Sequence, residues 1–300
     1  MISEFEHYIR FERQLSEATI EHYLFLLTTL QKFLRQDITA GSDLDKINRN
    51  GIAAYLEHLK TCGISKSSVS AYVVALRAYY KWAAYFYGTE NIKEASFYLN
   101  HIVKVSRSRK VPVTPSVDEV ALLRTTLRQY LQLNSYDKAS LRYQRILRAY
   151  AMIELLITSG LRCKELAGLR RKDIDLDGRV MFIKKGKGDH QRVSLFGDSA
   201  VEVLKEYFQY NVLNPEDFVF PVSHHTVIYN TVKLWARRSR INEKIHPHSF
   251  RHYFITESYR SGVRIETIAD QVGQVDLNTT RGYTHLDINF IKQEYRAVKV

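Results

Sequence analysis

The side chains between Ile245 and His285 could carry out chemistry together. His248 and Arg251 are three residues apart, so on a helix they would share one face and could bind one anion. Tyr283 follows later in the same stretch. A histidine, an arginine and a phenol directed at one point suit phosphoryl transfer. The arginine would neutralise phosphate oxygens, the histidine would donate a hydrogen bond or a proton, and the phenol oxygen would attack.

The length and the charge of the chain indicate its domain organisation and the kind of partner it binds. A chain of 300 residues with 45% apolar side chains can form two domains, each with its own core. The formal charge is +12 and is unevenly placed: residues 1–105 hold 12 Lys and Arg against 11 Asp and Glu, whereas 106–300 hold 32 against 21. A basic excess in one region predicts a polyanionic partner. Nucleic acid is favoured over a membrane surface, because no basic amphipathic segment is visible.

The two cysteines, Cys62 and Cys163, lie far apart and lack metal-ligand spacing, so neither a disulfide framework nor a zinc ribbon is expected. No apolar run approaches the length needed to span a bilayer. The first residues lack a basic segment followed by an apolar one, so no secretory signal is predicted. We therefore expect a cytoplasmic protein that associates with the nucleoid when it binds DNA.

The apolar periodicity predicts four helices in the first ninety residues or so. Residues 104–115 then read as a basic, extended segment with two prolines, which is typical of a linker. Ser116 and Glu119 match a capping box that opens the next helix. We expect a helical domain over 1–105, a linker over 106–115 and a second domain over 116–300.

The second domain is predicted to be mainly α-helical with a small antiparallel sheet. Alternating apolar residues around the turns at 177–178 and 186–189 indicate the strands. Before the sheet, residues 116–170 are expected to be mostly helical. After the sheet, helices are expected at 199–210, 226–240, 249–261 and 265–272, and the chain ends in a short amphipathic piece over 288–298.

Four motifs follow in order along this second domain. They read Thr-Ser-Gly-Leu-Arg162-Cys-Lys-Glu165-Leu, Lys-Gly-Lys187-Gly, His248-Ser-Phe-Arg251-His252 and Gly282-Tyr283-Thr-His285. In this order the chain resembles the tyrosine recombinases of the phage integrase family, with a layout similar to the Xer type. The resemblance implies a two-domain DNA clamp with a helical, SAM-like core-binding domain and a catalytic domain.

The resemblance also implies a role for each motif residue. Arg162 and Arg251 would clamp the scissile phosphate, and Glu165 would support Arg162. Tyr283 would attack the phosphorus and form a 3′-phosphotyrosyl link. Because a free phenol has a pKa of about 10, it needs cationic neighbours to act near neutral pH.

Two further residues complete the implied acid–base set. Lys187, on the hairpin turn, would protonate the leaving 5′ oxygen, and His248 would assist proton transfer.

Neither a cofactor nor a metal is expected. The implied partners are double-stranded DNA, further copies of the chain in a synaptic tetramer on two sites, and accessory DNA-bending proteins as a further candidate. Since no arm-binding domain precedes residue 1, binding to arm-type sites is not expected.

One position departs from the family pattern. Members usually carry histidine, or sometimes tryptophan, where this chain has Gln274. Glutamine can donate a hydrogen bond to a phosphate oxygen but cannot transfer a proton. We include Gln274 in the site as a hydrogen-bond donor. The alternative is that it marks a decayed site.

Other functions remain open at this point. A type IB topoisomerase would use nearly the same chemistry, and a DNA-binding regulator could keep the fold without the activity. His248 and His252, four residues apart, could also form a metal pair, although no third ligand is evident in the sequence.

Overall fold

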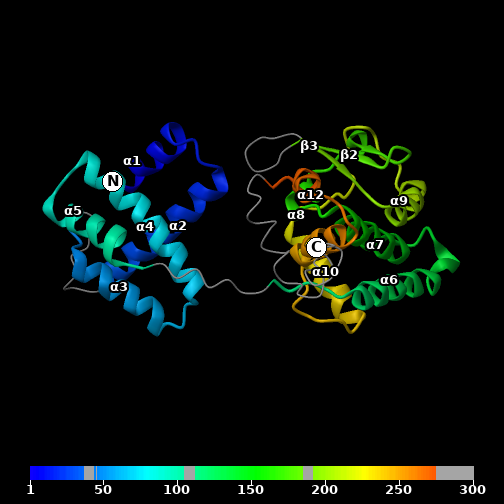
Figure 1. Ribbon diagram of the computed structural model, residues 1–300, viewed down its shortest axis with the longest axis horizontal. Coiled ribbons are helices and arrows are strands. Elements are labelled where there is room, and N and C mark those ends of the chain that lie inside the picture. Colours follow the sequence, from blue (N-terminus) through cyan, green and yellow to red (C-terminus); the bar gives the residue numbers. More distant parts are fainter. Residues whose placement is uncertain (37–43, 45, 105–111, 185–191, 275–300) are drawn as a thin grey trace, which may run out of the picture. The chain divides into compact units, whose positions relative to one another are not determined.

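The computed structural model describes residues 1–36, 44, 46–104, 112–184 and 192–274. The chain divides into two compact units, Met1–Lys110 and Val111–Val300, called here the first and the second unit (Figure 1). Each unit has its own cluster of buried apolar side chains. The linker expected at 106–115 falls largely outside the described residues, so the domain boundaries taken from the sequence stay predictions.

The first unit is helical throughout its described part. Its elements are α1 (Ile2–His7), η1 (Tyr8–Glu12), α2 (Glu17–Gln36), α3 (Arg49–Thr61), α4 (Lys66–Phe86), α5 (Glu90–Phe97) and η2 (Tyr98–Ile102). The sequence predicted four helices here, which correspond to α1 together with η1, α2, α3 and α4, and it missed α5 and the short π-helical segment η2 that continues α5.

Local signals explain where two of these helices begin. Asn48 precedes α3, and its side-chain oxygen accepts hydrogen bonds from Asn50 N at 3.0 Å and Gly51 N at 3.2 Å. Ser65 caps α4 through Ser68 N at 3.2 Å. The core that these helices enclose is rich in aromatic rings, with Phe5, Tyr79 and Trp82 in mutual contact.

The second unit combines helices with one small sheet. Its elements are α6 (Val117–Gln132), η3 (Ser135–Asp137), α7 (Leu141–Ser159), α8 (Cys163–Ala167), η4 (Arg171–Asp173), β1 (Ile174–Asp175), β2 (Val180–Ile183), β3 (Arg192–Leu195), α9 (Asp198–Tyr210), α10 (Thr226–Arg238), α11 (Pro247–Arg260) and α12 (Ile265–Val272). The predicted capping box of α6 is confirmed: Ser116 Oγ accepts from Glu119 N at 3.1 Å, and Glu119 Oε2 accepts from Ser116 N at 2.8 Å.

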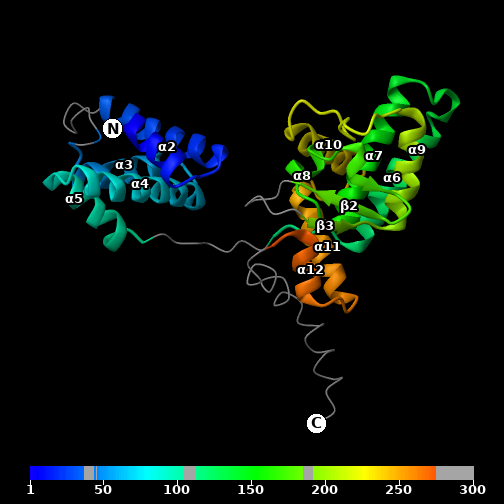
Figure 2. The ribbon, with the colours of Figure 1, turned by 90° about the horizontal axis from the view of Figure 1, so that it is seen from above.

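Helix α7 is the centre of the second unit, and α6, α9 and α11 pack around it (Figures 1 and 2). Most of its residues are buried, including the charged Glu154. Arg124 of α6 binds that carboxylate at 2.6 Å and 3.1 Å, which pairs a charge that burial would otherwise make costly.

The sheet is antiparallel in the order β1-β2-β3, as predicted. Ile174 pairs with Met181, and Ile183 pairs with Arg192. Strand β3 is an edge strand, and α12 lies beside it in both ribbon views (Figures 1 and 2). The side chain of Gln271 covers this edge: its Oε1 accepts from Leu195 N at 3.0 Å, and its Nε2 donates to Leu195 O at 2.7 Å. The side chain of Gln271 thereby joins α12 to the backbone of β3.

Within the described residues, no helix is both long and apolar enough to cross a lipid bilayer.

Candidate active site

The turn after α7 brings two motif arginines to one place. Gly160 ends the helix with φ +66°, a left-handed conformation that favours glycine. A Cβ at this position would lie 2.9 Å from Phe254 and 3.1 Å from Val272, so no larger residue fits without displacing them. The carbonyl of Gly160 accepts a hydrogen bond from Arg251 Nη1 at 2.8 Å, and Arg162 follows two residues later.

Arg251 lies inside the protein, with only 1% of its surface exposed. It comes from α11, which begins with His246 as its N-cap and Pro247 at its first position. A guanidinium group is the cation best suited to such a buried place, because it is weakly hydrated and carries five donors in a fixed geometry. The fold thus holds a positive charge at the base of the Gly160 turn.

Arg162 is held from two sides. Its Nη1 donates to Glu165 Oε1 at 2.8 Å, and its Nη2 donates to the carbonyl oxygen of Gly273 at 2.9 Å. The backbone N of Arg162 also donates to Glu165 Oε2 at 2.8 Å. The Arg162 side chain keeps 31% of its surface exposed, whereas that of Glu165 keeps 2%. The contact expected between Glu165 and Arg162 is therefore present, with the arginine facing solvent.

The electrostatics of Glu165 follow from these contacts. Burial acts to raise the pKa of its carboxyl group, but the charges of Arg192 and then Arg162, with the backbone hydrogen bond from Arg162, outweigh burial and lower it. Glu165 is consequently a carboxylate at neutral pH, and it can hold a guanidinium group in a fixed orientation.

His248 lies on α11 one turn before Arg251. Partial withdrawal from water lowers its pKa, and the nearby charges of Arg251, His246 and Arg162 lower it further. Two of these charges belong to the motif arginines, Arg251 on the same helix and Arg162. At neutral pH the imidazole is therefore neutral, with one nitrogen able to accept a proton and the other able to donate a hydrogen bond.

His252 follows one turn later, and its ring centroid lies 4.7 Å from that of His248. Burial, then the neighbouring His248, lower the pKa of His252 to about 4. Among the described residues, no group of three His, Cys, Asp or Glu side chains is placed to hold a metal ion. The metal-pair alternative for these two histidines gains no support.

Gln274 directly follows the C-terminal turn of α12. Gly273 ends that helix with φ +63°, and Gln274 N donates to Ala269 O at 2.9 Å. Because Gly273 O binds Arg162, Gln274 is one residue away from a contact of the first motif arginine. Lys187, Tyr283 and His285 lie outside the described residues.

Two family models match the sequence. The phage integrase family matches residues 123–289, and the phage integrase N-terminal SAM-like domain matches residues 2–85. The chain belongs to the phage integrase family. The resemblance drawn from the four motifs is thus confirmed, and so is the enzyme class it implied, tyrosine recombinase.

Named relatives and solved structures agree with this membership. "Tyrosine recombinase XerC" of Pediococcus pentosaceus is 29% identical, over 99% of this chain and 96% of the relative. "Tyrosine recombinase XerD" of Oceanobacillus iheyensis is also 29% identical, over 99% and 97%. A structure of the XerH site-specific recombinase bound to its palindromic difH substrate has a TM-score of 0.73 at 22% identity, covering 98% of this chain and 84% of that one. The predicted fold class, mainly helical with a small antiparallel sheet, is confirmed.

One residue that contacts the site, Arg192, belongs to none of the four motifs. Arg192, the first residue of β3, donates to Glu165 Oε1 at 3.2 Å and to Glu165 Oε2 at 3.0 Å. In the sequence it stands in an ordinary strand pattern, 27 positions from its carboxylate partner. A single arginine in such a pattern carries no local signal of this contact.

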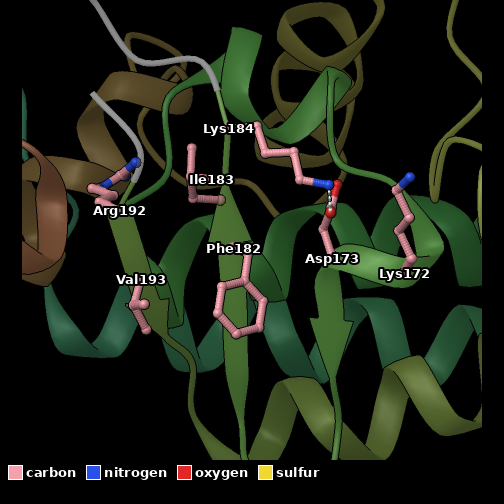
Figure 3. Close-up of a pocket in the computed structure, with 7 residues that line it drawn as sticks. All are labelled: Lys172, Asp173, Phe182, Ile183, Lys184, Arg192 and Val193. Atoms are coloured by element: carbon pink, nitrogen blue, oxygen red, sulfur yellow. Dashed lines mark ion pairs between the residues drawn. The ribbon is translucent and has the colours of Figure 1, made fainter. Parts of the chain in front are cut away.

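An open pocket lies beside η4, β2 and β3 (Figure 3). Its lining residues are Lys172, Asp173, Phe182, Ile183, Lys184, Arg192 and Val193. Lys184, which directly follows β2, is paired with the buried Asp173 at 2.5 Å. The pocket contains none of the residues predicted from the motifs.

Proposed function

We propose that the chain is a site-specific DNA recombinase that cuts and rejoins DNA through a 3′-phosphotyrosyl intermediate. The observation that carries the proposal is the arrangement of Arg162 and Arg251 around the Gly160 turn. One guanidinium is buried against the turn, and the other is held at the surface by Glu165 and Gly273. Two fixed cations beside a neutral histidine suit a phosphodiester whose charge grows in the transition state.

The reaction begins with cleavage. The phenol oxygen of Tyr283 attacks the scissile phosphorus, and the bond from phosphorus to the 5′ oxygen breaks. Lys187 supplies the proton for the leaving 5′ oxygen, and His248 takes part in moving the proton of the phenol. Arg162 and Arg251 bind the non-bridging oxygens throughout.

Rejoining is the reverse reaction with a new 5′ hydroxyl. That hydroxyl attacks the phosphotyrosyl phosphorus, and the Tyr283 oxygen leaves. Because the covalent link retains the energy of the phosphodiester, the cycle needs no ATP. Gln274 contributes a neutral hydrogen bond to a non-bridging oxygen, in place of the imidazole found in other members.

The partners follow from the charge and from the neighbours. The basic excess of residues 106–300 suits double-stranded DNA. Several similar structures are DNA complexes, among them a Tn1549 transposon integrase with transposon right end DNA, which has a TM-score of 0.65 at 18% identity and covers 99% of this chain and 98% of that one. We propose assembly into a tetramer on two DNA sites. The clamp arrangement, accessory DNA-bending proteins and a cytoplasmic, nucleoid-associated location stay predictions.

The test starts from DNA that the protein itself selects. Duplexes bound from a random pool are cloned as two copies in a supercoiled plasmid and incubated with the protein in the presence of a chelator. We expect recombinant circles or deletions. Relaxed topoisomers alone would indicate a type IB topoisomerase, and bound but unchanged plasmid would indicate a regulator; either result contradicts the proposal.

A further inference from the structure

Arg162 and Arg192 occupy matching positions between Glu165 and the end of α12. Each guanidinium donates hydrogen bonds both to Glu165 and to a backbone carbonyl at the end of α12. Arg162 reaches Glu165 and the carbonyl of Gly273, whereas Arg192 reaches Glu165 and the carbonyl of Gln271 at 3.1 Å. Both acceptor carbonyls belong to the C-terminal turn of a helix, where the partial charge is negative. One carboxylate and one helix end therefore share two arginines.

The carboxylate oxygens of Glu165 are shared evenly between the two arginines. Oε1 accepts from Arg162 Nη1 at 2.8 Å and from Arg192 Nη1 at 3.2 Å. Oε2 accepts from the backbone N of Arg162 at 2.8 Å and from Arg192 Nη2 at 3.0 Å. The Arg192 side chain is 11% exposed and the Glu165 side chain 2%, so the solvent competes little for these bonds.

The close packing of Gly273 shows that Arg192 also fixes the helix end. A Cβ on Gly273 would lie 2.9 Å from both Cδ and Nε of Arg192. Figure 3 shows Arg192 leaving β3 away from Lys184, on the side of the sheet where α12 lies. The residue after Gly273 is Gln274, so a displacement of Arg192 reaches two parts of the site, the guanidinium of Arg162 and the amide of Gln274.

We infer that Arg192 is a positioning residue for the proposed recombination reaction: it neutralises Glu165 and fixes the α12 end, so that Arg162 keeps its charge and orientation for the scissile phosphate. Without Arg192, the carboxylate would be left with Arg162 as its single cationic partner within the part of the chain that the structure describes. The pair would then be neutral as a whole, and Arg162 would bind an incoming phosphate less well. With Arg192 present, the group of three carries one net positive charge.

This role differs from a packing role in its dependence on pH. Among the described residues, the charged groups that donate hydrogen bonds to Glu165 are Arg162, directly before α8, and Arg192 on β3. The α12 carbonyls, which are uncharged, accept hydrogen bonds from these two arginines. The charge of Arg162 also acts on His248 of α11, which is common to all the variants compared. Removing the charge of Arg192 raises the pKa of the Glu165 carboxyl group. As the pH falls through that raised value, Glu165 takes up a proton and releases Arg162.

The experiment compares single-turnover cleavage rates of nicked suicide duplexes over a range of pH. Arg192→Gln should slow cleavage by roughly 10- to 100-fold at neutral pH, the order expected when a catalytic group is displaced by a fraction of an ångström to one ångström. The variant rate should also fall at a higher pH than the wild-type rate on the acid side. Arg192→Lys, which keeps the charge but not the planar fork, should keep the wild-type acid limb with an intermediate rate.

Two controls separate the possible failures. Arg179→Gln removes another arginine of the same sheet region, one paired with the exposed Asp198, and should leave the rate and its pH profile unchanged. The double variant Glu165→Gln with Arg192→Gln should lose the shifted acid limb, because no carboxyl group remains to titrate. Adduct formation by the wild type tests the proposed function itself.

Wild-type rate and profile in a folded Arg192→Gln protein would overturn the inference while leaving the proposed function intact. So would a slow rate with an unshifted acid limb, which indicates packing alone. If Arg192→Gln does not fold, the decision passes to Arg192→Lys, whose full wild-type rate would equally count against the role.

Discussion

The two units of this chain bury different kinds of side chain. In the described part of the first unit the buried set is apolar and aromatic, with Tyr55, Tyr79 and Tyr80 among its largest members. The buried charged residues of the described chain all belong to the second unit: Glu154, Glu165, Asp173 and Arg251, together with His252. Both units are compact, so a buried charge is not a requirement for forming a core of this size.

This difference indicates what the buried charges are for. A buried ion pair often stabilises a fold no better than apolar residues of the same volume would, while its desolvation is costly. The second unit keeps several such groups, and two of them, Glu165 and Arg251, fix or form the pair of cations around the Gly160 turn. The described part of the first unit holds no motif residue, and its buried side chains are apolar or aromatic.

The largest expected effect comes from Arg251→Met, which replaces a buried cation by an apolar side chain of similar length. Cleavage should fall by roughly 1000-fold, because a preorganised donor to the developing charge is lost. The melting temperature of the protein should change little, since the methionine avoids the cost of burying a charge. Single-turnover cleavage and thermal denaturation of the same preparation measure both effects.

The matched control for this variant lies in the first unit. Leu30 of α2 is fully buried, and Leu30→Ala should lower the free energy of unfolding by about 2–5 kcal/mol. Its single-turnover rate at saturating DNA, measured below the unfolding temperature, should match the wild type. A stable, fast Arg251→Met protein or a stable, slow Leu30→Ala protein would reverse the proposed division between the units.

The next effect is a pH dependence of stability that belongs to the second unit. The folded pKa of His252 is about 4, below its ordinary value of 6.5, so the unfolded chain binds more protons between these values. Its contribution to stability is therefore complete above pH 6.5 and is lost as the pH falls toward 4. The loss amounts to about 3 kcal/mol from this one group.

Denaturant titrations of the wild type and of His252→Gln across this pH range test the prediction. The variant should show a shallower fall in unfolding free energy as the pH decreases. His22→Gln, at an exposed position of the first unit, serves as the control and should keep the wild-type slope. Equal slopes for all three proteins would remove His252 as the cause.

The smallest expected effect concerns Gln274. If its amide gives one hydrogen bond to a phosphate oxygen, Gln274→Ala should slow cleavage by roughly 10- to 100-fold without abolishing it. Gln274→His should remain active, because imidazole can donate the same bond. Single-turnover rates of the three proteins on one substrate compare these outcomes. A wild type that is inert until histidine is introduced would instead identify a decayed site.

The sequence predicted those features of the fold and the site that local patterns of residue types determine. Helix α12 was predicted with its observed bounds, Ile265–Val272, since its apolar residues recur at helical spacing and a glycine ends it. The motifs likewise located Arg162, Glu165 and Arg251, because a motif reports residue types at fixed spacing. Helix α5 was missed because it is short and buries only Ile92 and Ala95.

The remaining part of the site depends on tertiary contacts. Arg192 acts on Glu165 and on Gln271 through contacts between β3, α8 and α12, segments that no spacing rule connects. The pairing of Arg251 with the Gly160 carbonyl spans 91 positions and could not be inferred from either motif alone. The roles of Lys187 and Tyr283, which lie outside the described residues, stay predictions.

The most direct test of the account is to identify the residue that becomes linked to DNA. The wild type is incubated with a nicked suicide duplex, and the protein–DNA adduct is digested and sequenced by mass spectrometry. We predict a 3′-phosphotyrosyl bond on Tyr283, with no adduct from Tyr283→Phe although that variant still binds the duplex. An adduct on another residue, or one that persists in Tyr283→Phe, would contradict the claim that the two arginines serve a phosphate attacked by Tyr283.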